Sequence, residues 1–281
     1  MLIGIPDPAV YRSAYRMKHI VPNMLCSAAL AVAAPIAHAQ TKPAAAPLAA
    51  PKIDWAFMAK LPDWSGVWIP DRTDQDKQLT GNVPPWTAEV AKQVDQDLAD
   101  ERAGKPHNLF LDCLPEAMPT WMMISHNAME ILVTPGRVTM LGESDANRLR
   151  RIYTDGRKHP ADPDPSFHGH SIGTWQGQTL VVDTVAILPQ TWIAIKEAAG
   201  IPNNGDMHIV ERIYLSAPDV LADELTITAP HVLTAPYKTT RYFKRQRGEK
   251  ADILEGVCLQ GSVVEAKDKF GNDIFVAAKH E

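Results

Sequence analysis

The residues best suited to chemistry lie between Phe167 and Gln178, in the stretch FHGHSIGTWQGQ. Within it, Gly169 to Gly173 spell G-x-S-x-G, the pattern that presents the nucleophilic serine of α/β-hydrolases. Such a nucleophile requires a buried strand directly before the serine and a helix directly after it. Here a proline-rich segment, DPDPSFH, precedes the motif and a predicted hairpin, TWQGQTLVVDT, follows it. The context therefore argues against Ser171 as an elbow nucleophile.

His170, the second residue of the same motif, is a better candidate for catalysis. The Gln176-Gly177 dipeptide predicts a two-residue turn, and counting back along the two strands places His170 opposite Asp183. A carboxylate beside an imidazole fixes its tautomer and leaves the other nitrogen free to act as a general base or acid. The alternative is a buried histidine whose carboxylate partner only holds the register of the hairpin. In either case Ser171 points to the other face of the strand.

A polar loop precedes this hairpin and adds further groups that carry charge or protons. Asp155, Arg157 and His159 fall within five residues of one another, just before the His170 strand. An arginine binds an oxyanion or carboxylate bidentately, and a histidine transfers protons. The loop therefore predicts that Asp155, Arg157 and His159 join the catalytic site. The alternative is a plain Asp-Gly turn with Arg157 on the surface.

A metal site is a separate possibility, since His168-x-His170 on one strand face gives bidentate spacing. Zinc would need a third ligand, for which His159 and Asp183 are the candidates. The H-x-H pattern alone is a weak signal, so no metal is predicted. The sequence also has no glycine-rich phosphate loop or dinucleotide fingerprint, and no organic cofactor is expected.

Aromatic side chains are candidates for the walls of a binding cavity. The expected substrate-binding residues are Tyr153, His168, Trp175 and Trp192. Tryptophans are more often ordinary core residues, and that alternative applies here too.

Residues 129 to 246 show the period of two that is typical of strands. The predicted strands are 129–134, 137–141, 148–154, 171–175, 179–187, 208–215, 224–229 and 238–246, with a weaker one at 261–265. Because 208–215 is a strand, His208 and Glu211 point to opposite faces, which argues against their sharing one site. A single amphipathic helix is predicted over TAEVAKQVDQDLADERAG, where Val90, Val94 and Leu98 recur every four residues.

Short strands linked by tight turns predict an antiparallel meander that closes into a barrel. The expected fold is mainly β: an antiparallel up-and-down β-barrel, lipocalin-like, with one amphipathic helix. Barrels of this size hold one small ligand in the mouth. The polar cluster around His170 is expected to lie there.

Composition and the N-terminal region bound the location and the partners. The chain has 281 residues and a net charge of -5, which argues against a nucleic-acid partner. Residues 1–39 are predicted to be a signal peptide that ends in Ala-His-Ala, with Met17 as a candidate true start. An Ala/Pro linker is predicted at 40–52 and a single barrel domain at 53–281, with no membrane span after leader removal. The protein is therefore expected to be periplasmic or secreted.

Removal of the leader leaves two cysteines, Cys113 and Cys258. In an oxidising compartment, two cysteines far apart in sequence are expected to form one disulfide. The alternative is two separate buried thiols.

Several motifs resemble those of a large family of uncharacterised secreted bacterial proteins. The matching runs are ILVTPGRVTMLGE, RRIYTDGRKHPADPDPSFHGHSIGTWQGQTLVVDTV, MHIVERIYL and DCLPEAMP. The resemblance extends from Trp68 to about Cys258 and implies the fold and export, but no established reaction. The residues that match the family pattern are Asp155, Arg157, His159, His170, Asp183 and Glu211. Asn203 stands where relatives often carry a histidine, and His168 occupies a usually apolar position, which weakens a family-wide metal site.

Together these observations predict an acid–base enzyme without a cofactor, acting on a hydrophobic aromatic, terpenoid or steroid-like small molecule. The expected reaction is that of a lyase, isomerase or hydrolase. His170, oriented by Asp183, is expected to move the proton, while Arg157 stabilises negative charge. Two alternatives stay open: a non-catalytic carrier of an apolar ligand, and a zinc-dependent hydrolase. The sequence leaves the oligomeric state open.

Overall fold

The structure, a computed structural model, describes residues 53–74, 77–105, 115–124, 126–143, 147–248, 251–256, 263–267, 269 and 273–277. These residues belong to one compact unit. The predicted leader and linker lie outside the described residues. Cys113 and Cys258 also lie outside them, and the disulfide stays a prediction.

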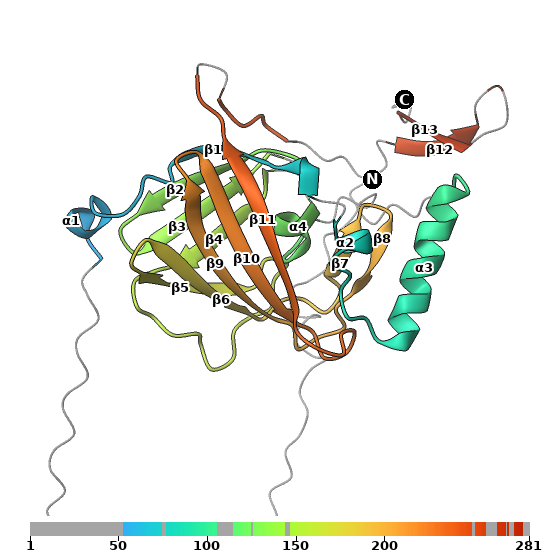
Figure 1. Ribbon diagram of the computed structural model, residues 1–281, viewed down its shortest axis with the longest axis horizontal. Helices are drawn as coiled ribbons and strands as arrows, with labels where there is room; N and C mark the ends of the chain where they lie inside the picture. Colours follow the sequence, from blue (N-terminus) through green and yellow to red (C-terminus); the bar gives the residue numbers. More distant parts are fainter. Residues whose placement is uncertain are drawn as a thin grey trace, which may run out of the picture. The chain divides into compact units, whose positions relative to one another are not determined.

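Nine strands close into a barrel, in which the sheet curls round until β1 pairs with both β2 and β11 (Figure 1). In spatial order the strands are β1 (Gly66–Pro70), β11 (Tyr237–Arg245), β10 (Val220–Thr228), β9 (His208–Ala217), β6 (Thr179–Val185), β5 (His170–Gln176), β4 (Leu149–Tyr153), β3 (Arg137–Gly142) and β2 (Met129–Thr134). The predicted mainly-β barrel is confirmed. Each of these strands except β1 was expected near its observed position; β1 is short and bounded by glycine and proline, which hides its pattern.

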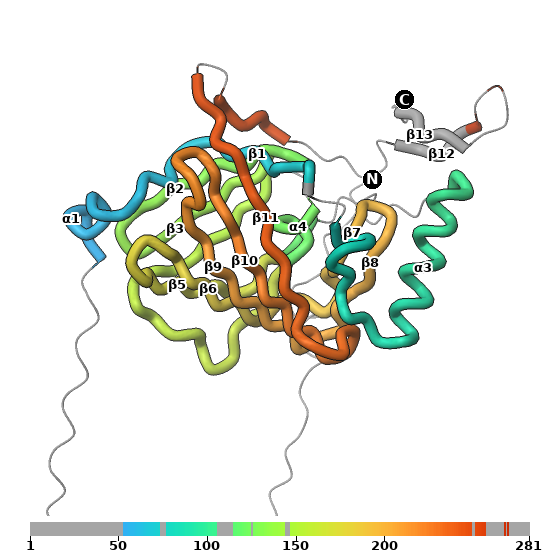
Figure 2. Tube along the Cα trace, in the orientation of Figure 1, coloured from blue at the N-terminus to red at the C-terminus, as the bar shows by residue number. Residues whose placement is uncertain are grey.

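One strand pair departs from the expected all-antiparallel order. β4 and β5 run parallel, with Ile152 beside Ser171 and Tyr153 beside Ile172. Parallel neighbours need a crossover of a dozen or more residues, and residues 154–169 supply it. Figure 2 shows this connection as the loop that extends beyond β5 and β6. Its far end is fixed by Ser166, whose backbone N–H donates to the Ala186 carbonyl at 3.0 Å.

A small hairpin interrupts the order at a second place. β7 (Trp192–Lys196) and β8 (Ala199–Pro202) pair with each other, outside the barrel. The chain then returns, so that β6 pairs with β9 across this insertion. A further hairpin joins β12 (Val263–Lys267) to β13 (Asp273–Ala277).

The predicted amphipathic helix is confirmed as α3 (Ala88–Arg102). Thr87 caps it by accepting a hydrogen bond from the Val90 N–H at 3.4 Å, and Val90 and Val94 are buried. Shorter helical segments are α1 (Trp55–Met58), η2 (Arg72–Asp74), α2 (Lys77–Thr80) and α4 (Thr120–Ile124). None of the described helices has the length and apolar character needed to cross a membrane.

The barrel interior is filled by the side chains of alternate strand residues. Most are apolar and buried, among them Ile209, Ile213, Leu221, Leu225 and Phe243. An interior polar layer crosses this apolar core; its members, each at most 2% exposed, are Arg150, Ser171, Thr184, Glu211, Asp223 and Arg241. The strand residues between these buried positions face outward.

The guanidinium of Arg150 organises one side of the interior polar layer. It donates to Glu211 Oε1 at 2.8 Å, to Thr184 Oγ1 at 3.1 Å and to Ser171 Oγ at 3.3 Å. Ser171 is thus a buried partner of Arg150, on the opposite side of the barrel wall from its neighbour His170. This placement agrees with the expectation that Ser171 is not an elbow nucleophile.

Candidate active site

The β5–β6 hairpin sets the position of His170, and its predicted register is wrong by two residues. Ile172 lies opposite Asp183, and His170 lies opposite Val185. The turn consists of Gly177 and Gln178, because Gly177 takes the left-handed conformation, φ +63°, that a non-glycine residue adopts at a cost. A shift of two preserves the faces, so His170 and Asp183 still project from the same side of the hairpin as diagonal neighbours.

His159 joins these two residues from the connection between β4 and β5. Its Nε2 lies 2.9 Å from Asp183 Oδ1, and its Nδ1 lies 2.7 Å from His170 Nδ1. The two imidazole planes are nearly perpendicular, at 67°. Asp183 therefore reaches His170 through His159 rather than directly, which corrects the expected dyad.

A fourth residue, His208 of β9, completes the group. Its Nε2 lies 3.0 Å from Asp183 Oδ2, so this carboxylate has a histidine on each oxygen. Glu211, three residues on, is buried against Arg150, and the expectation that His208 and Glu211 face opposite ways is confirmed. Sequence reasoning set His208 aside because the pairing of β6 with β9, across the β7–β8 insertion, has no local signal. We call His159, His170, Asp183 and His208 the histidine cluster.

The hydrogen bonds to Asp183 determine where the protons lie in the histidine cluster. A carboxylate only accepts, so His159 carries its proton on Nε2 when it is neutral. Its Nδ1 then accepts from His170 Nδ1–H, which leaves the lone pair of His170 on Nε2. That nitrogen is a base at the end of a relay of two imidazoles and one carboxylate.

The environment of His170 favours the neutral, basic form. Burial lowers the pKa of His170 below its ordinary value of 6.5, and electrostatic effects of the neighbouring His159 and Arg157 lower it further. The ring is also stacked on Tyr153, with centroids 5.5 Å apart. His170 is therefore available as a base at neutral pH.

Arg157 and Asp155, both expected in the site, pair with each other beside the histidine cluster. Arg157 Nε lies 2.9 Å from Asp155 Oδ1, and its Nη2 contacts Asp155 Oδ2. The guanidinium lies over the Tyr153 ring, 3.9 Å from its centroid. The side-chain hydrogen bond raises the pKa of Arg157 and lowers that of Asp155, so both stay charged. The Arg157 guanidinium therefore covers one face of Tyr153.

His168 does not share a strand face with His170, contrary to expectation, because β5 begins only at His170. Gly169 between them has φ +67°, which breaks the strand alternation. The His168 ring packs against Trp121, with centroids 5.2 Å apart. Burial, with smaller effects of Arg150 and Arg148, lowers its pKa to about 3. The described residues contain no group of three or more His, Cys, Asp or Glu side chains arranged to hold a metal ion.

The other aromatic candidates divide between the site and the core. Trp175 packs against Trp64 in the core, with ring centroids 5.0 Å apart. Trp192 lies on β7, and its backbone carbonyl accepts from the Thr120 hydroxyl. Only Tyr153 and His168, of the four predicted substrate-binding residues, line the groove beside His170.

This groove has a volume of about 460 Å³ and runs along the outer wall of the barrel. We call it the His170 groove; its lining residues are Pro115, Leu149, Arg151, Tyr153, Asp164, Ser166, Phe167, His168, Gly169, His170 and Ser171. His170 and Asp183 alternate with the buried residues Ser171 and Thr184, so they face outward. The expected position at the mouth of the barrel is therefore wrong.

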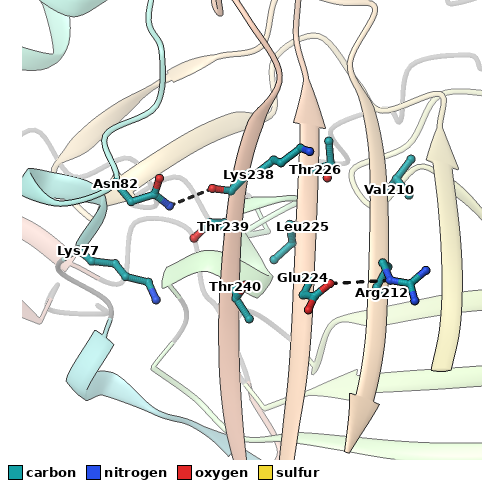
Figure 3. Close-up of a pocket in the computed structure, with 10 residues that line it drawn as sticks. All are labelled: Lys77, Asn82, Val210, Arg212, Glu224, Leu225, Thr226, Lys238, Thr239 and Thr240. Carbon is teal, nitrogen blue, oxygen red and sulfur yellow. Dashed lines mark hydrogen bonds and ion pairs between the residues drawn. The ribbon is translucent and has the colours of Figure 1, made fainter. Parts of the chain in front are cut away.

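A second groove, of about 540 Å³, lies farther along the outer face, over β9, β10 and β11 (Figure 3). Its wall carries Arg212, paired with Glu224 at 3.8 Å, and Asn82, which donates to the Lys238 carbonyl at 2.9 Å. Val210, which lies opposite Asp183 in the sheet, also lines it. None of the histidine cluster lines this larger groove, so it has no equivalent base.

The comparisons with known proteins add no function to this geometry. No protein-family model matches the chain, and a search of curated proteins finds no match. The resemblance set out from the motifs stays a prediction.

Proposed function

We propose that this protein is an acid–base enzyme in which His170 moves a proton on a small, largely apolar molecule bound in the His170 groove. The observation that carries the proposal is the relay from Asp183 through His159 to His170, with contacts of 2.9 and 2.7 Å. A histidine held in this way has a fixed tautomer, a carboxylate that stabilises its protonated form through His159, and a second nitrogen that makes no hydrogen bond with the described residues. A histidine with a purely structural role does not require these three features together.

In the reaction, the lone pair of His170 Nε2 takes a proton from a C–H or O–H group of the substrate. The substrate gains the negative charge and His170 becomes an imidazolium. Its Nδ1–H already faces His159 Nδ1, so the positive charge is shared between the two rings. The Asp183 carboxylate at 2.9 Å stabilises that charge. His170 then returns the proton to another atom, as in an isomerase, or to a leaving group, as in a lyase.

The size and lining of the groove support a small-molecule substrate. A volume of about 460 Å³ falls within the usual range of small-molecule sites. Phe167 and Tyr153 offer aromatic surface beside the imidazole, and Leu149 extends it. This favours an aromatic, terpenoid or steroid-like molecule. The predicted leader supports action in the periplasm or outside the cell.

Exchange of substrate hydrogen for deuterium tests the proposal. Purified protein is incubated in D₂O with a pool of aromatic and terpenoid ketones and enones, and mass spectrometry follows deuterium uptake. We expect wild-type protein to label at least one compound, and His170→Asn to slow labelling by roughly 10²- to 10⁴-fold. His231→Asn is the matched control, since His231 Nε2 also lies 3.0 Å from a carboxylate, that of Asp206, but lies outside the cluster.

Labelling that is unchanged in His170→Asn contradicts the proposal. Compounds that bind and are recovered without label or rearrangement favour the carrier instead.

A further inference from the structure

Arg151 lies next to the proposed base and lines the same groove. On β4, Leu149, Arg151 and Tyr153 alternate with buried residues and face outward. The parallel register pairs Ile152 with Ser171, so one position earlier Arg151 lies beside His170. Neighbouring strands are about 4.8 Å apart, and paired side chains project from the same face. Both Arg151 and His170 line the His170 groove.

The arginines around this groove differ in whether their guanidinium is already paired. The fork of Arg157 holds the Asp155 carboxylate through Nε, at 2.9 Å, and through Nη2. Arg137 lies over Tyr153, 5.7 Å from its centroid, and does not line the groove. The exposed Arg151 side chain makes no hydrogen bond or ion pair with the described residues. Arg151 is therefore the cation in the groove whose guanidinium makes no ion pair with the described residues.

A cation with an open fork, on an apolar wall beside a base, is suited to one class of ligand. Guanidinium binds carboxylate bidentately, with geometry that a neutral group does not reproduce. Asp164 is the carboxylate that also lines the groove, from the β4–β5 connection, and it repels an anion from that side. An anionic group entering the groove is thus directed to the β4 wall.

We propose that Arg151 binds a carboxylate of the substrate, so that the molecules processed here are apolar acids rather than neutral hydrocarbons or alcohols. This inference rests on the proposed function of His170. It also assigns to Arg151 the anion-binding role that the sequence suggested for Arg157. With the carboxylate on Arg151, carbon atoms a few bonds away come within reach of His170 Nε2.

Binding of two matched probes, 2-naphthoate and 2-naphthalenemethanol, tests the proposal without any turnover. Calorimetry or NMR titration gives the Kd of each for wild-type protein, Arg151→Gln, Arg151→Lys, Arg157→Gln and Arg137→Gln. We expect the wild type to bind the carboxylate at least tenfold more tightly than the alcohol. Arg151→Gln abolishes that preference, and Arg151→Lys retains part of it, because lysine keeps the charge without the fork. Arg137→Gln controls for the loss of one exposed positive charge, and its effect should stay within twofold.

Three results overturn the proposal: equal binding of the two probes, no measurable binding of 2-naphthoate, or a loss of preference in Arg157→Gln as large as in Arg151→Gln. Asp164→Asn gives an independent check, because removing the like charge should tighten naphthoate binding.

These binding readouts are separate from deuterium labelling. Carboxylate selectivity that depends on Arg151 with no labelling by any variant refutes the acid–base function alone. Labelling that requires His170 while Arg151→Gln keeps its probe affinities refutes the carboxylate site alone.

Discussion

His159 is the residue that couples the rest of the histidine cluster. Both of its ring nitrogens are engaged, one with Asp183 and one with His170. A neutral imidazole has one N–H, so the proton that faces Asp183 decides the direction of the hydrogen bond to His170. Removal of a proton from one ring changes what the other can donate. The hydrogen-bonding roles of the two rings are therefore coupled to each other.

The relay makes a prediction about tautomers that needs no substrate. At neutral pH we expect His159 to carry its proton on Nε2 and His170 on Nδ1, because the Asp183 carboxylate only accepts. Long-range ¹H–¹⁵N correlation spectra distinguish the two tautomers. Asp183→Asn removes the charged acceptor and should leave both rings as mixtures. Asp206→Asn, which removes the equivalent acceptor from His231, should change neither. A wild-type His170 protonated on Nε2 would contradict the relay.

The sequence predicts which residues form the site better than it predicts which of them are in contact. His170 and Asp183 follow from period-two alternation and a nearby turn, and His159 from its place in the loop before the strand. The actual contacts depend on which residues form the turn and on how the proline-rich connection folds back, and neither follows from alternation. His208 requires knowing that β6 pairs with β9 across an inserted hairpin. Arg151 looks like an ordinary exposed strand residue until β4 and β5 are known to be parallel.

The β4–β5 connection brings His159 over the sheet, and Gly169 is where it re-enters the barrel. A Cβ at Gly169 would lie 2.6 Å from the Val185 carbonyl oxygen and 2.8 Å from Ile187 Cγ1. The nearest of these neighbours is a backbone oxygen, so the added Cβ cannot be accommodated by the movement of a flexible side chain alone. Gly169 also has φ +67°, which an L side chain disfavours. The β4–β5 connection can therefore re-enter the barrel here only because residue 169 is a glycine and has no Cβ.

Gly169→Ala should therefore destabilise the protein by roughly 2–4 kcal/mol, from overpacking and backbone strain together. Gly177→Ala is the matched control, because its φ of +63° is similar but nothing lies within 4 Å of its Cβ position. The control should cost only about 1 kcal/mol, the backbone term alone. Urea unfolding measures both. Equal costs would show that the close contact at Gly169 is relieved by a small shift of the chain.

At the level of elements, the barrel follows from the sequence while part of its topology does not. Short strands of period two, separated by turn residues, indicate closure because a barrel leaves no open edge. A proline-rich segment reads as a loop whether the next strand runs parallel or antiparallel. The choice is made by contacts between distant residues, such as the Ser166 N–H on the Ala186 carbonyl. The β7–β8 hairpin was also not predicted. It packs beside α3 and α4 rather than within the barrel wall, so its position too depends on contacts between distant residues.

Across the whole molecule, the interior polar layer makes the fold sensitive to its charge state. Arg150 keeps its charge through Glu211, whereas burial and the adjacent Glu211 raise the pKa of Asp223 well above its ordinary value of 3.8. Asp223 is thus held toward its neutral form beside the contact between Arg150 and Glu211. Such a layer tolerates an additional unpaired charge poorly, since the low dielectric strengthens repulsion and removes solvation. His168 is the titratable neighbour that can introduce one, beside Arg150 and Arg148.

The stability of the protein should therefore fall with acid in a way that depends on His168. Its pKa is about 3 in the folded protein against an ordinary 6.5, so the unfolded chain binds the proton more tightly. Stability from this group is complete above pH 6.5 and is lost as the pH falls from there toward 3. Between pH 7 and pH 4 the loss is about 3 kcal/mol. His168→Gln, which does not titrate, should narrow the difference in unfolding free energy between these two pH values by that amount. His231→Gln, at an exposed position outside the interior polar layer, controls for the loss of one histidine. If the unfolding free energies of His168→Gln and the wild type fall equally between pH 7 and pH 4, His168 accepts a proton in the folded barrel at no cost. The interior polar layer would then not resist the added charge.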